Sequence, residues 1–406
     1  MQSKARLRLF IMFLFLCTSV PATGAAPAIF VATAGNGGSD SNDCLAASNG
    51  GGHGPCLTLQ HATAVAMNYN FGGSSTTVNI GTGTFQGTAI SGYLQNPGSN
   101  VNTEFLILNG NGSANTTIND TGSHTYVLDP SGGMQIILQN MNISVPANET
   151  GIFAQLPGTF VLIGNGVTFT GQAVSSIAIH VEDFAAVSFP ASQTLTTNGS
   201  FGYFLTAGFN GQAGFVGTIN CGTATFGTVF ALVDGGSLAN FANTWSGCGA
   251  VTGIPYSVKG NSLLVNTSGT PLPGNTTGIV DSGGRYRPAS TPTVLSATGL
   301  GTGGTATVSA GSGSHGGIIT LNTGTASTAA SGAVTIAMQE LQIITGGSVL
   351  APCTATLVNF GATWTQGSTW NMAQNSPNLT VNWSNNGVAL TASQTYRINY
   401  VCNGDF

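Results

Sequence analysis

Apolar residues recur along the middle of the chain every 25 or 26 positions. Other apolar residues stand two and four positions before each of them, so each repeat carries a short strand whose alternate side chains face inward. A fixed period of this size is typical of a solenoid, in which each coil buries its inner side against its neighbours. The pattern therefore predicts a parallel β-helix, most regular between residues 150 and 266. The column that defines the repeat consists of Leu156, Val181, Ala207, Val233 and Val258.

Three phenylalanines follow the same period. Phe189, Phe215 and Phe241 each stand eight residues after a member of the column. Equivalent places in successive coils lie above one another, so these rings are expected to form an aromatic stack in the core.

The pattern of apolar and polar residues changes on both sides of the regular coils. Residues 29–75 predict a short strand, a Gly- and Asn-rich loop and a capping helix over 57–69 with one apolar face. We expect β-helix coils over 76–280, followed by a linker over 281–292. Residues 293–406 carry short alternating segments between turn residues, which predict a C-terminal antiparallel β-sandwich.

The first 25 residues have the pattern of a secretory signal peptide. Lys4, Arg6 and Arg8 precede a short apolar run over 9–20, and small residues follow at 23–26. No second apolar run approaches the length of a membrane span. We therefore expect an exported protein without a membrane span, either secreted or held in the periplasm or at the cell surface.

The cysteines agree with export. Six of the seven lie beyond the signal peptide, and an even number in an exported chain favours disulfides. Cys221 and Cys248 occupy nearly the same place in adjacent coils, and coils stack roughly 4.8 Å apart, close to the separation that a disulfide requires. The predicted pairs are Cys44–Cys56, Cys221–Cys248 and Cys353–Cys402.

Charged side chains are scarce and make up 5% of the residues. Beyond the signal peptide four basic residues stand against 12 acidic ones, so the net charge is −8. Nucleic-acid binding needs clustered cations and is therefore excluded. An anionic polymer would likewise be a poor ligand. No Cys/His metal motif or phosphate-binding loop is present in the sequence, so we expect no metal and no other cofactor.

Three short motifs follow one another near the N-terminus. Phe30-Val31-Ala32 is a strand, Gly38-Ser39-Asp40-Ser41-Asn42-Asp43 is a loop, and Leu59-Gln60-His61-Ala62 opens a helix. This order resembles the opening of right-handed parallel β-helix proteins of the pectate-lyase-like superfamily. The resemblance implies a right-handed β-helix over about residues 29–280, and in carbohydrate-active members substrate lies along an outer sheet face. The Gly-, Thr- and Ser-rich composition of the C-terminal part is similar to that of β-domains of phage-derived or surface-exposed bacterial proteins.

The strand register assigns a set of side chains to such an outer face. Phe153, Phe204 and Phe230 are predicted to face outward, with Gln155 in a neighbouring column. Rings stack on the C–H faces of sugars and amides bond to their hydroxyls, so these residues are the candidate ligand-binding set. The same rings would suit cover by a loop or the C-terminal unit, or a contact within a homo-oligomer. The leading hypothesis is an exported, non-catalytic β-helix that acts in adhesion or binds a glycan or cell-surface polysaccharide.

The alternative hypothesis is a polysaccharide-active glycoside hydrolase or lyase. Glu182 and Asp234 lie two coils apart, roughly 10 Å by strand spacing, which is just feasible for a glycosidase. His180 would tune an acid, and Lys259 is the only cation in the coils and the candidate base for elimination. Of the polygalacturonase motifs of this fold only Gly52-His53-Gly54 occurs, in the entrance loop. The scarcity of acid, base and metal-ligating groups ranks binding above catalysis.

Overall fold

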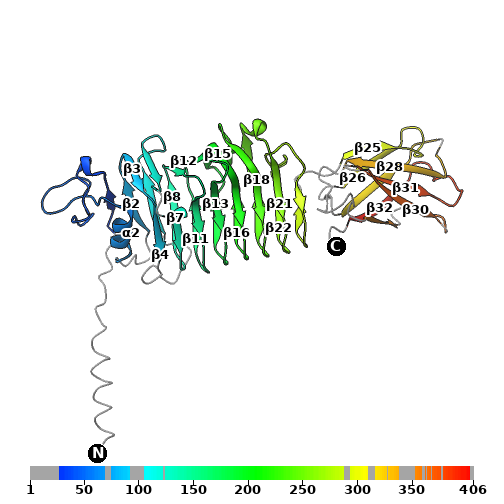
Figure 1. Cartoon of the computed structure of the whole chain (residues 1–406). Helices are drawn as coiled ribbons and strands as arrows, with labels where there is room; N and C mark the ends of the chain where they lie inside the picture. The colour runs from blue at the N-terminus through cyan, green and yellow to red at the C-terminus, as the bar shows by residue number, and fades with distance from the viewer. Residues whose placement is uncertain are drawn as a thin grey trace, which may run out of the picture.

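The chain forms a parallel β-solenoid of about eight turns followed by antiparallel sheets (Figure 1). With 51% of residues in strands and 5% in helices, it is an all-β protein, as predicted. The computed structural model describes residues 27–68, 75–91, 105–121, 124–287, 293–309, 316–326, 328–337, 353–358, 362, 364–366, 368–375 and 378–402. The predicted signal peptide over 1–25 lies outside these residues.

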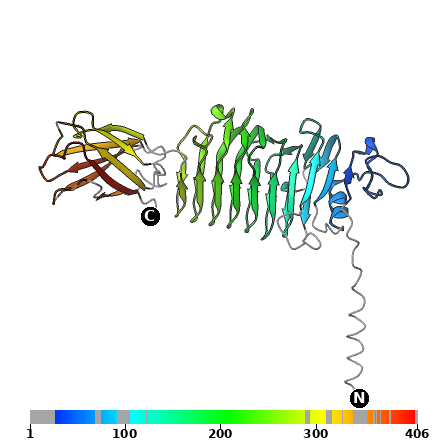
Figure 2. The same cartoon turned by 180° about the vertical axis from the view of Figure 1, so that it is seen from behind.

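The coils build three parallel ladders, because each strand pairs with its counterpart one coil away. The first ladder consists of β1 (Ile29–Val31), β2 (Thr76–Ile80), β5 (Leu106–Gly110), β8 (Gln135–Gln139), β11 (Phe160–Ile163), β14 (Ala186–Phe189), β16 (Gln212–Phe215), β19 (Leu238–Phe241), β22 (Leu263–Asn266) and β24 (Arg285–Arg287). Figure 2 shows its strands as a row of parallel arrows. Its last strand, β24, lies within the range 281–292 that was expected to be a linker.

The other two ladders share one long strand, β15 (Thr194–Ala207), which belongs to both. The second ladder consists of β3 (Gly83–Gln86), β6 (Thr116–Asn119), β9 (Asn142–Val145), β12 (Val167–Gln172), β15, β17 (Thr218–Asn220) and β20 (Thr244–Ser246). The third ladder consists of β4 (Thr88–Ser91), β7 (Tyr126–Ser131), β10 (Thr150–Ala154), β13 (Ile177–Val181), β15, β18 (Thr225–Val233), β21 (Ile254–Val258) and β23 (Ile279–Val280).

The interior of the coils is a continuous apolar core that contains the predicted aromatic stack. Phe189, Phe215 and Phe241 share one register on the first ladder and are fully buried. The rings of Phe215 and Phe241 lie 4.9 Å apart and are nearly parallel. The burial and shared register of all three rings are therefore confirmed, and the stacking is confirmed for Phe215 and Phe241.

The N-terminal end of the solenoid is covered by the one α-helix of the described residues, α2 (Leu59–Met67). Thr58 caps it by accepting a hydrogen bond from the backbone N–H of His61. The apolar side of α2, including Leu59, Ala62 and Ala66, is buried in the solenoid core. Cover of this kind protects the open end of a stacked sheet from pairing with another chain. Two short 3₁₀ helices, η1 (Ala34–Asn36) and η2 (Cys248–Ala250), lie in loops.

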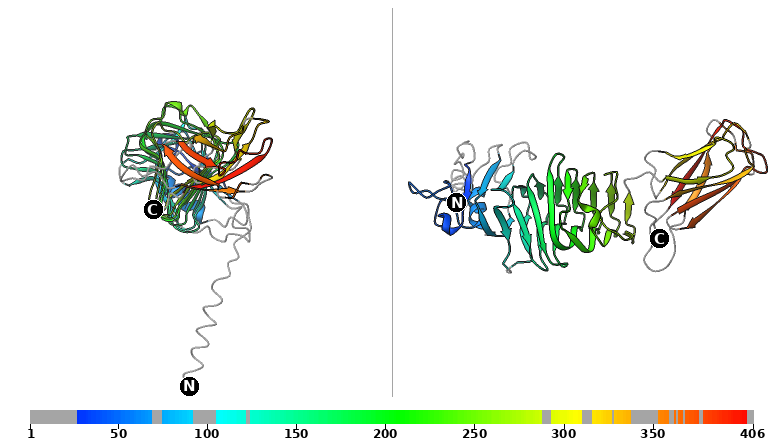
Figure 3. Two further views of the ribbon diagram at one scale, coloured as in Figure 1. Left: turned by 90° about the vertical axis from the view of Figure 1, so that its right-hand side faces the viewer. Right: turned by 90° about the horizontal axis from the view of Figure 1, so that it is seen from above.

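The C-terminal unit contains two four-stranded antiparallel sheets (Figure 3). Both contribute to one core that includes Ile319, Val334, Val381 and Ile398, which agrees with the predicted sandwich. One sheet orders β25 (Thr293–Ala297), β28 (Ser331–Ala337), β31 (Asn378–Ser384) and β30 (Thr369–Asn375). The other orders β26 (Thr305–Val308), β27 (Gly316–Asn322), β32 (Thr395–Cys402) and β29 (Cys353–Val358).

Two of the three predicted disulfides are present. Cys221–Cys248 joins adjacent coils with a Cα–Cα distance of 4.9 Å, and Cys44–Cys56 has one of 4.8 Å. For the third pair, the backbone register of β29 and β32 places Cys353 directly opposite Cys402. The side chains of that pair lie outside the described residues, so this disulfide stays a prediction.

Among the helices that the structure describes, none has the length and apolarity that a membrane crossing requires.

Candidate functional site

The outward side chains of the third ladder, together with the residue that follows each strand, form what we call the candidate face. Register stacks Phe153 on His180, His180 on Thr206, and so on through Leu232 and Ser257. A second column follows the strand ends and contains Gln155, Glu182, Asp234 and Lys259. The parallel ladder thus aligns these residues in two columns along the coils, and Gly208 leaves the second column without a side chain on the coil of β15.

The first regular coil lies two residues out of the register that the sequence pattern suggested. Ala154, not Leu156, pairs with Val181, and Leu156 is 43% exposed at a corner. A slip of two residues leaves the inward–outward alternation intact, so the apolar pattern does not reveal it. The assignment of Leu156 to the inner column was therefore wrong, and Phe153 stands in the column of His180.

The prediction that Phe204 and Phe230 face outward was wrong. Both are buried, at 0% and 1% exposure, and their rings stack 4.9 Å apart inside the core. The pairing of β15 with β18 is irregular between Phe201 and Tyr203. Ala178 and Pro255, at the same position of β13 and β21, are buried as well, so strict alternation fails at this position on successive coils and Phe204 is buried together with its neighbour Leu205. Phe204 and Phe230 therefore cannot contact a ligand on this surface.

A row of half-buried rings crosses the candidate face on three successive coils. The rings of Tyr126 and Phe153 lie 6.2 Å apart and are stacked, and those of Phe153 and His180 lie 4.9 Å apart and are tilted. His124 extends the row, 5.6 Å from Tyr126. We call Tyr126, Phe153 and His180 the aromatic row. Of its members, the sequence analysis placed Phe153 on an outer face, named His180 as a residue that would tune an acid, and missed Tyr126.

Polar groups flank the aromatic row on one side. Gln155 donates a hydrogen bond of 2.9 Å to Asp129, and the Tyr126 hydroxyl bonds to the same carboxyl group. Burial raises the pKa of Asp129, and these two hydrogen bonds oppose the shift only in part. The predicted ligand-binding residues Phe153 and Gln155 are therefore on one surface, next to a carboxyl group that the prediction did not include.

His180 and Glu182 lie together at the end of β13. The His180 Nε2 atom is 3.2 Å from Glu182 Oε2. Burial lowers the pKa of His180 to about 4, so at neutral pH this is a contact between an uncharged imidazole and a carboxyl group. Burial and then the charge of Asp183 raise the pKa of Glu182. A general acid requires a raised pKa, because it must still hold its proton near neutral pH.

Asp234 and Lys259 lie in the same column as Glu182, on later coils. Their side chains form an ion pair of 3.3 Å, and Asp234 Oδ1 also accepts a hydrogen bond from the Gly235 N–H. Asp234 thus has both a cation and a backbone group as partners at its corner. The structure places the four candidate catalytic residues on one edge of the candidate face, but it pairs them as His180 with Glu182 and Lys259 with Asp234.

Sequence reasoning missed a buried carboxyl pair at the start of the third ladder. Asp120 and Glu149 interact there beside His124, and both carboxyl groups are buried. Burial disfavours ionisation of Asp120, but hydrogen bonds from His124 and Gln86 outweigh it and lower the pKa of Asp120. Burial and then the Asp120 charge raise the pKa of Glu149 to about 7. The separation of His124 and Glu149 by 25 residues, one coil, was the available signal.

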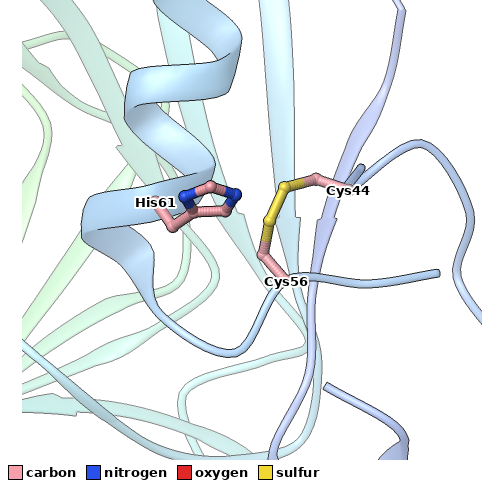
Figure 4. Close-up of side chains that lie close together, drawn as sticks. All are labelled: Cys44, Cys56 and His61. Carbon is pink, nitrogen blue, oxygen red and sulfur yellow. A yellow bond between two sulfur atoms is a disulfide. The ribbon is translucent and has the colours of Figure 1, made fainter. Parts of the chain in front are cut away.

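Cys44, Cys56 and His61 form a cluster near α2 with the spacing of metal ligands (Figure 4). Their potential ligand atoms lie within 4.8 Å of one another. Both sulfur atoms are already joined in a disulfide, and zinc requires thiolates. The disulfide therefore ties Cys44 to Cys56 just before the capping helix, and the cluster is not a metal centre in this state.

Two pockets of the solenoid lie away from the candidate face. One, of about 310 Å³, is lined by Phe30, Asn79 and Asn109 on the first ladder. The other, of about 480 Å³, is lined by Trp245 and Leu272 beside the Cys221–Cys248 disulfide. The aromatic row lines neither of them.

The chain matches no protein-family model, and it shows no significant similarity to any curated protein or solved structure.

Proposed function

We propose that this protein is an exported, non-catalytic β-helix that binds a neutral glycan along the candidate face, at a cell surface or in the extracellular space. The observation that carries the proposal is the aromatic row, one ring on each of three successive coils, with Asp129, Gln155 and Glu182 beside it. Aromatic faces pack on the C–H faces of sugars, and amide and carboxyl groups bond to sugar hydroxyls.

Charge and disulfides support the same proposal. The chain has 12 acidic and seven basic residues, so an anionic polymer would be repelled and an uncharged glycan would not. The two disulfides are compatible with an extracellular location. The resemblance of the N-terminal motifs to the pectate-lyase-like superfamily and of the C-terminal part to bacterial surface proteins points in the same direction.

Replacing Phe153 by alanine is expected to weaken glycan binding by about tenfold, because the central ring of the row is lost. The measurement is a pull-down of the purified full chain with insoluble cellulose, chitin and xylan over a range of protein concentrations. Phe160→Ala is the matched control: Phe160 is on the same coil and is also half-buried, but it lies on the first ladder.

The control variant should bind like the wild type, and circular dichroism should show both variants folded. Equal losses in the two variants would mean that binding does not use the candidate face. A wild-type protein that binds none of the three polysaccharides would contradict the proposed function.

A second candidate function, glycan hydrolysis, is favoured by one observation, the raised pKa of Glu182 beside His180. If the protein is a hydrolase, Glu182→Gln should abolish the release of reducing ends from the bound polysaccharide and leave binding within about twofold. Wild-type protein that binds but releases no product would rule out this candidate. Release that persists in the variant would exclude Glu182 as the acid.

A further inference from the structure

Each of five successive coils passes from the third ladder to the first through a corner of two residues with positive φ. Backbone pairing on both sides keeps these corners in register. This left-handed conformation is favourable for glycine and acceptable for asparagine, and it is unfavourable for large side chains. The corner pairs are Asp183–Phe184, Phe209–Asn210, Gly235–Gly236, Gly260–Asn261 and Ser282–Gly283.

Two of these corners carry phenylalanine where the later coils carry glycine, asparagine or, at the last corner, serine. Phe184 has φ of 63° and Phe209 has φ of 48°. Neither ring gains from burial, since they are 61% and 65% exposed, more than any other large apolar side chain in the described residues. The chain therefore accepts both backbone strain and the exposure of a ring to water at these two places, and the fold requires neither.

The two rings lie at the border of the candidate face. Phe184 follows Glu182 by two residues, and Phe209 follows the end of β15 by two residues. On the preceding coil Leu156, 43% exposed and also with positive φ, directly follows Gln155. We call Leu156, Phe184 and Phe209 the corner ridge. It places one apolar side chain on each of three successive coils; Phe209 is in register with Asp183, so Phe184 and Phe209 stand one corner position apart.

We infer that the corner ridge is a second line of contact for the glycan of the candidate face, on which Phe184 and Phe209 stack against successive sugar rings of a neutral polysaccharide that runs along the solenoid axis. This inference rests on the proposed function. Coils stack roughly 4.8 Å apart, a spacing comparable to the length of one sugar residue. Backbone strain that persists in exposed residues is a mark of a functional position.

The chemistry around the ridge favours a sugar over a lipid surface or a protein partner. Glu182 and Asp183 directly precede Phe184 in the chain, and the charges of these carboxyl groups would repel an anionic membrane. The exposed rings of Phe184 and Phe209 share their corners with the polar residues Asp183 and Asn210, whereas the centre of a protein interface is depleted of charged residues. Separate rings between polar groups match the alternating C–H and hydroxyl surfaces of a glycan.

The test uses Phe209→Gly and Phe184→Asn, which install the residues that later coils carry at the same corner positions. Each variant is expected to weaken the pull-down with cellulose, chitin or xylan by about tenfold. Each should also raise the melting temperature slightly or leave it unchanged, because the backbone strain is relieved. Val174→Ala is the matched control: Val174 is 60% exposed on the coil of Phe184 but lies in the turn before β13.

The outcomes separate this inference from the proposed function. If the wild type binds and the two ridge variants bind equally well, the ridge inference is overturned, while Phe153→Ala still reports on the candidate face. Wild-type protein that binds no polysaccharide overturns both. A loss of self-association in light scattering, without a change in polysaccharide binding, would show that the ridge contacts a second copy of the chain and would overturn the inference as well.

Discussion

Phe204→Ala is expected to lower the free energy of unfolding by about 4 kcal/mol, the range found when a buried aromatic ring is removed from a core. Phe204 is fully buried, stacks on Phe230 at 4.9 Å and lies 5.4 Å from Phe215 in the first ladder. Removing its ring leaves a cavity between two ladders that the backbone pairing holds apart. The measurement is urea unfolding followed by tryptophan fluorescence and circular dichroism.

Phe209→Ala is the matched control for this prediction. Phe209 stands five residues later in the same coil but is 65% exposed, so its loss should change the free energy of unfolding by less than about 0.5 kcal/mol. Equal effects of the two substitutions would show that Phe204 lies on the surface, as the apolar pattern alone suggested. The pair of variants therefore tests the corrected register of β15 directly.

The buried carboxyl pair is expected to make the protein less stable as pH rises from about 4.5 to about 7. The pKa of Glu149 is raised from 4.5 to about 7 in the folded state, so between these values the folded chain holds a proton that the unfolded chain has released. Glu149 makes its full contribution to the free energy of unfolding below pH 4.5, and this contribution is lost as pH rises through 7. The shift corresponds to about 3 kcal/mol.

Glu149→Gln isolates this contribution, because glutamine keeps the shape of the protonated side chain and does not ionise. The difference in unfolding free energy between variant and wild type should increase in favour of the variant across that pH window and be constant above about pH 8. A difference that stays flat from pH 4 to pH 8 would show that Glu149 is ionised in the folded protein. Asp129 and Glu182, whose pKa values are also raised, remain in both proteins and cancel in the comparison.

The parts of the fold that were predictable depend on local spacing. The stack of Phe189, Phe215 and Phe241 and the Cys221–Cys248 disulfide followed from a period that the backbone pairing enforces on every coil. The capping helix followed from one apolar face of α2. Small errors in the assumed register do not change these predictions, because a parallel ladder repeats the same contacts from coil to coil.

The parts that were not predictable depend on which way a side chain points at an irregular position. Phe204 changed from the surface to the core because strict alternation fails at its position, where Ala178 and Pro255 on other coils are buried too. Gln155 changed column because Ala154 pairs with Val181, two positions earlier than the repeat pattern suggested, which aligns Gln155 with Glu182. A shift of this kind changes which residues are predicted for the candidate site, because those residues are selected by the direction in which their side chains point and not by the repeat period.

The order of residues alone determined that this chain winds into a β-solenoid, with alternating strands, a helical cap, cysteines in adjacent coils and a separate C-terminal β-unit. The tertiary structure decided which rings lie on the surface, that Asp120 and Glu149 share a buried corner, and that Phe184 and Phe209 are exposed in strained turns. The reason is physical. Apolar burial and backbone pairing act through spacing, which the sequence displays, whereas bulges and corner conformations redirect side chains without changing that spacing.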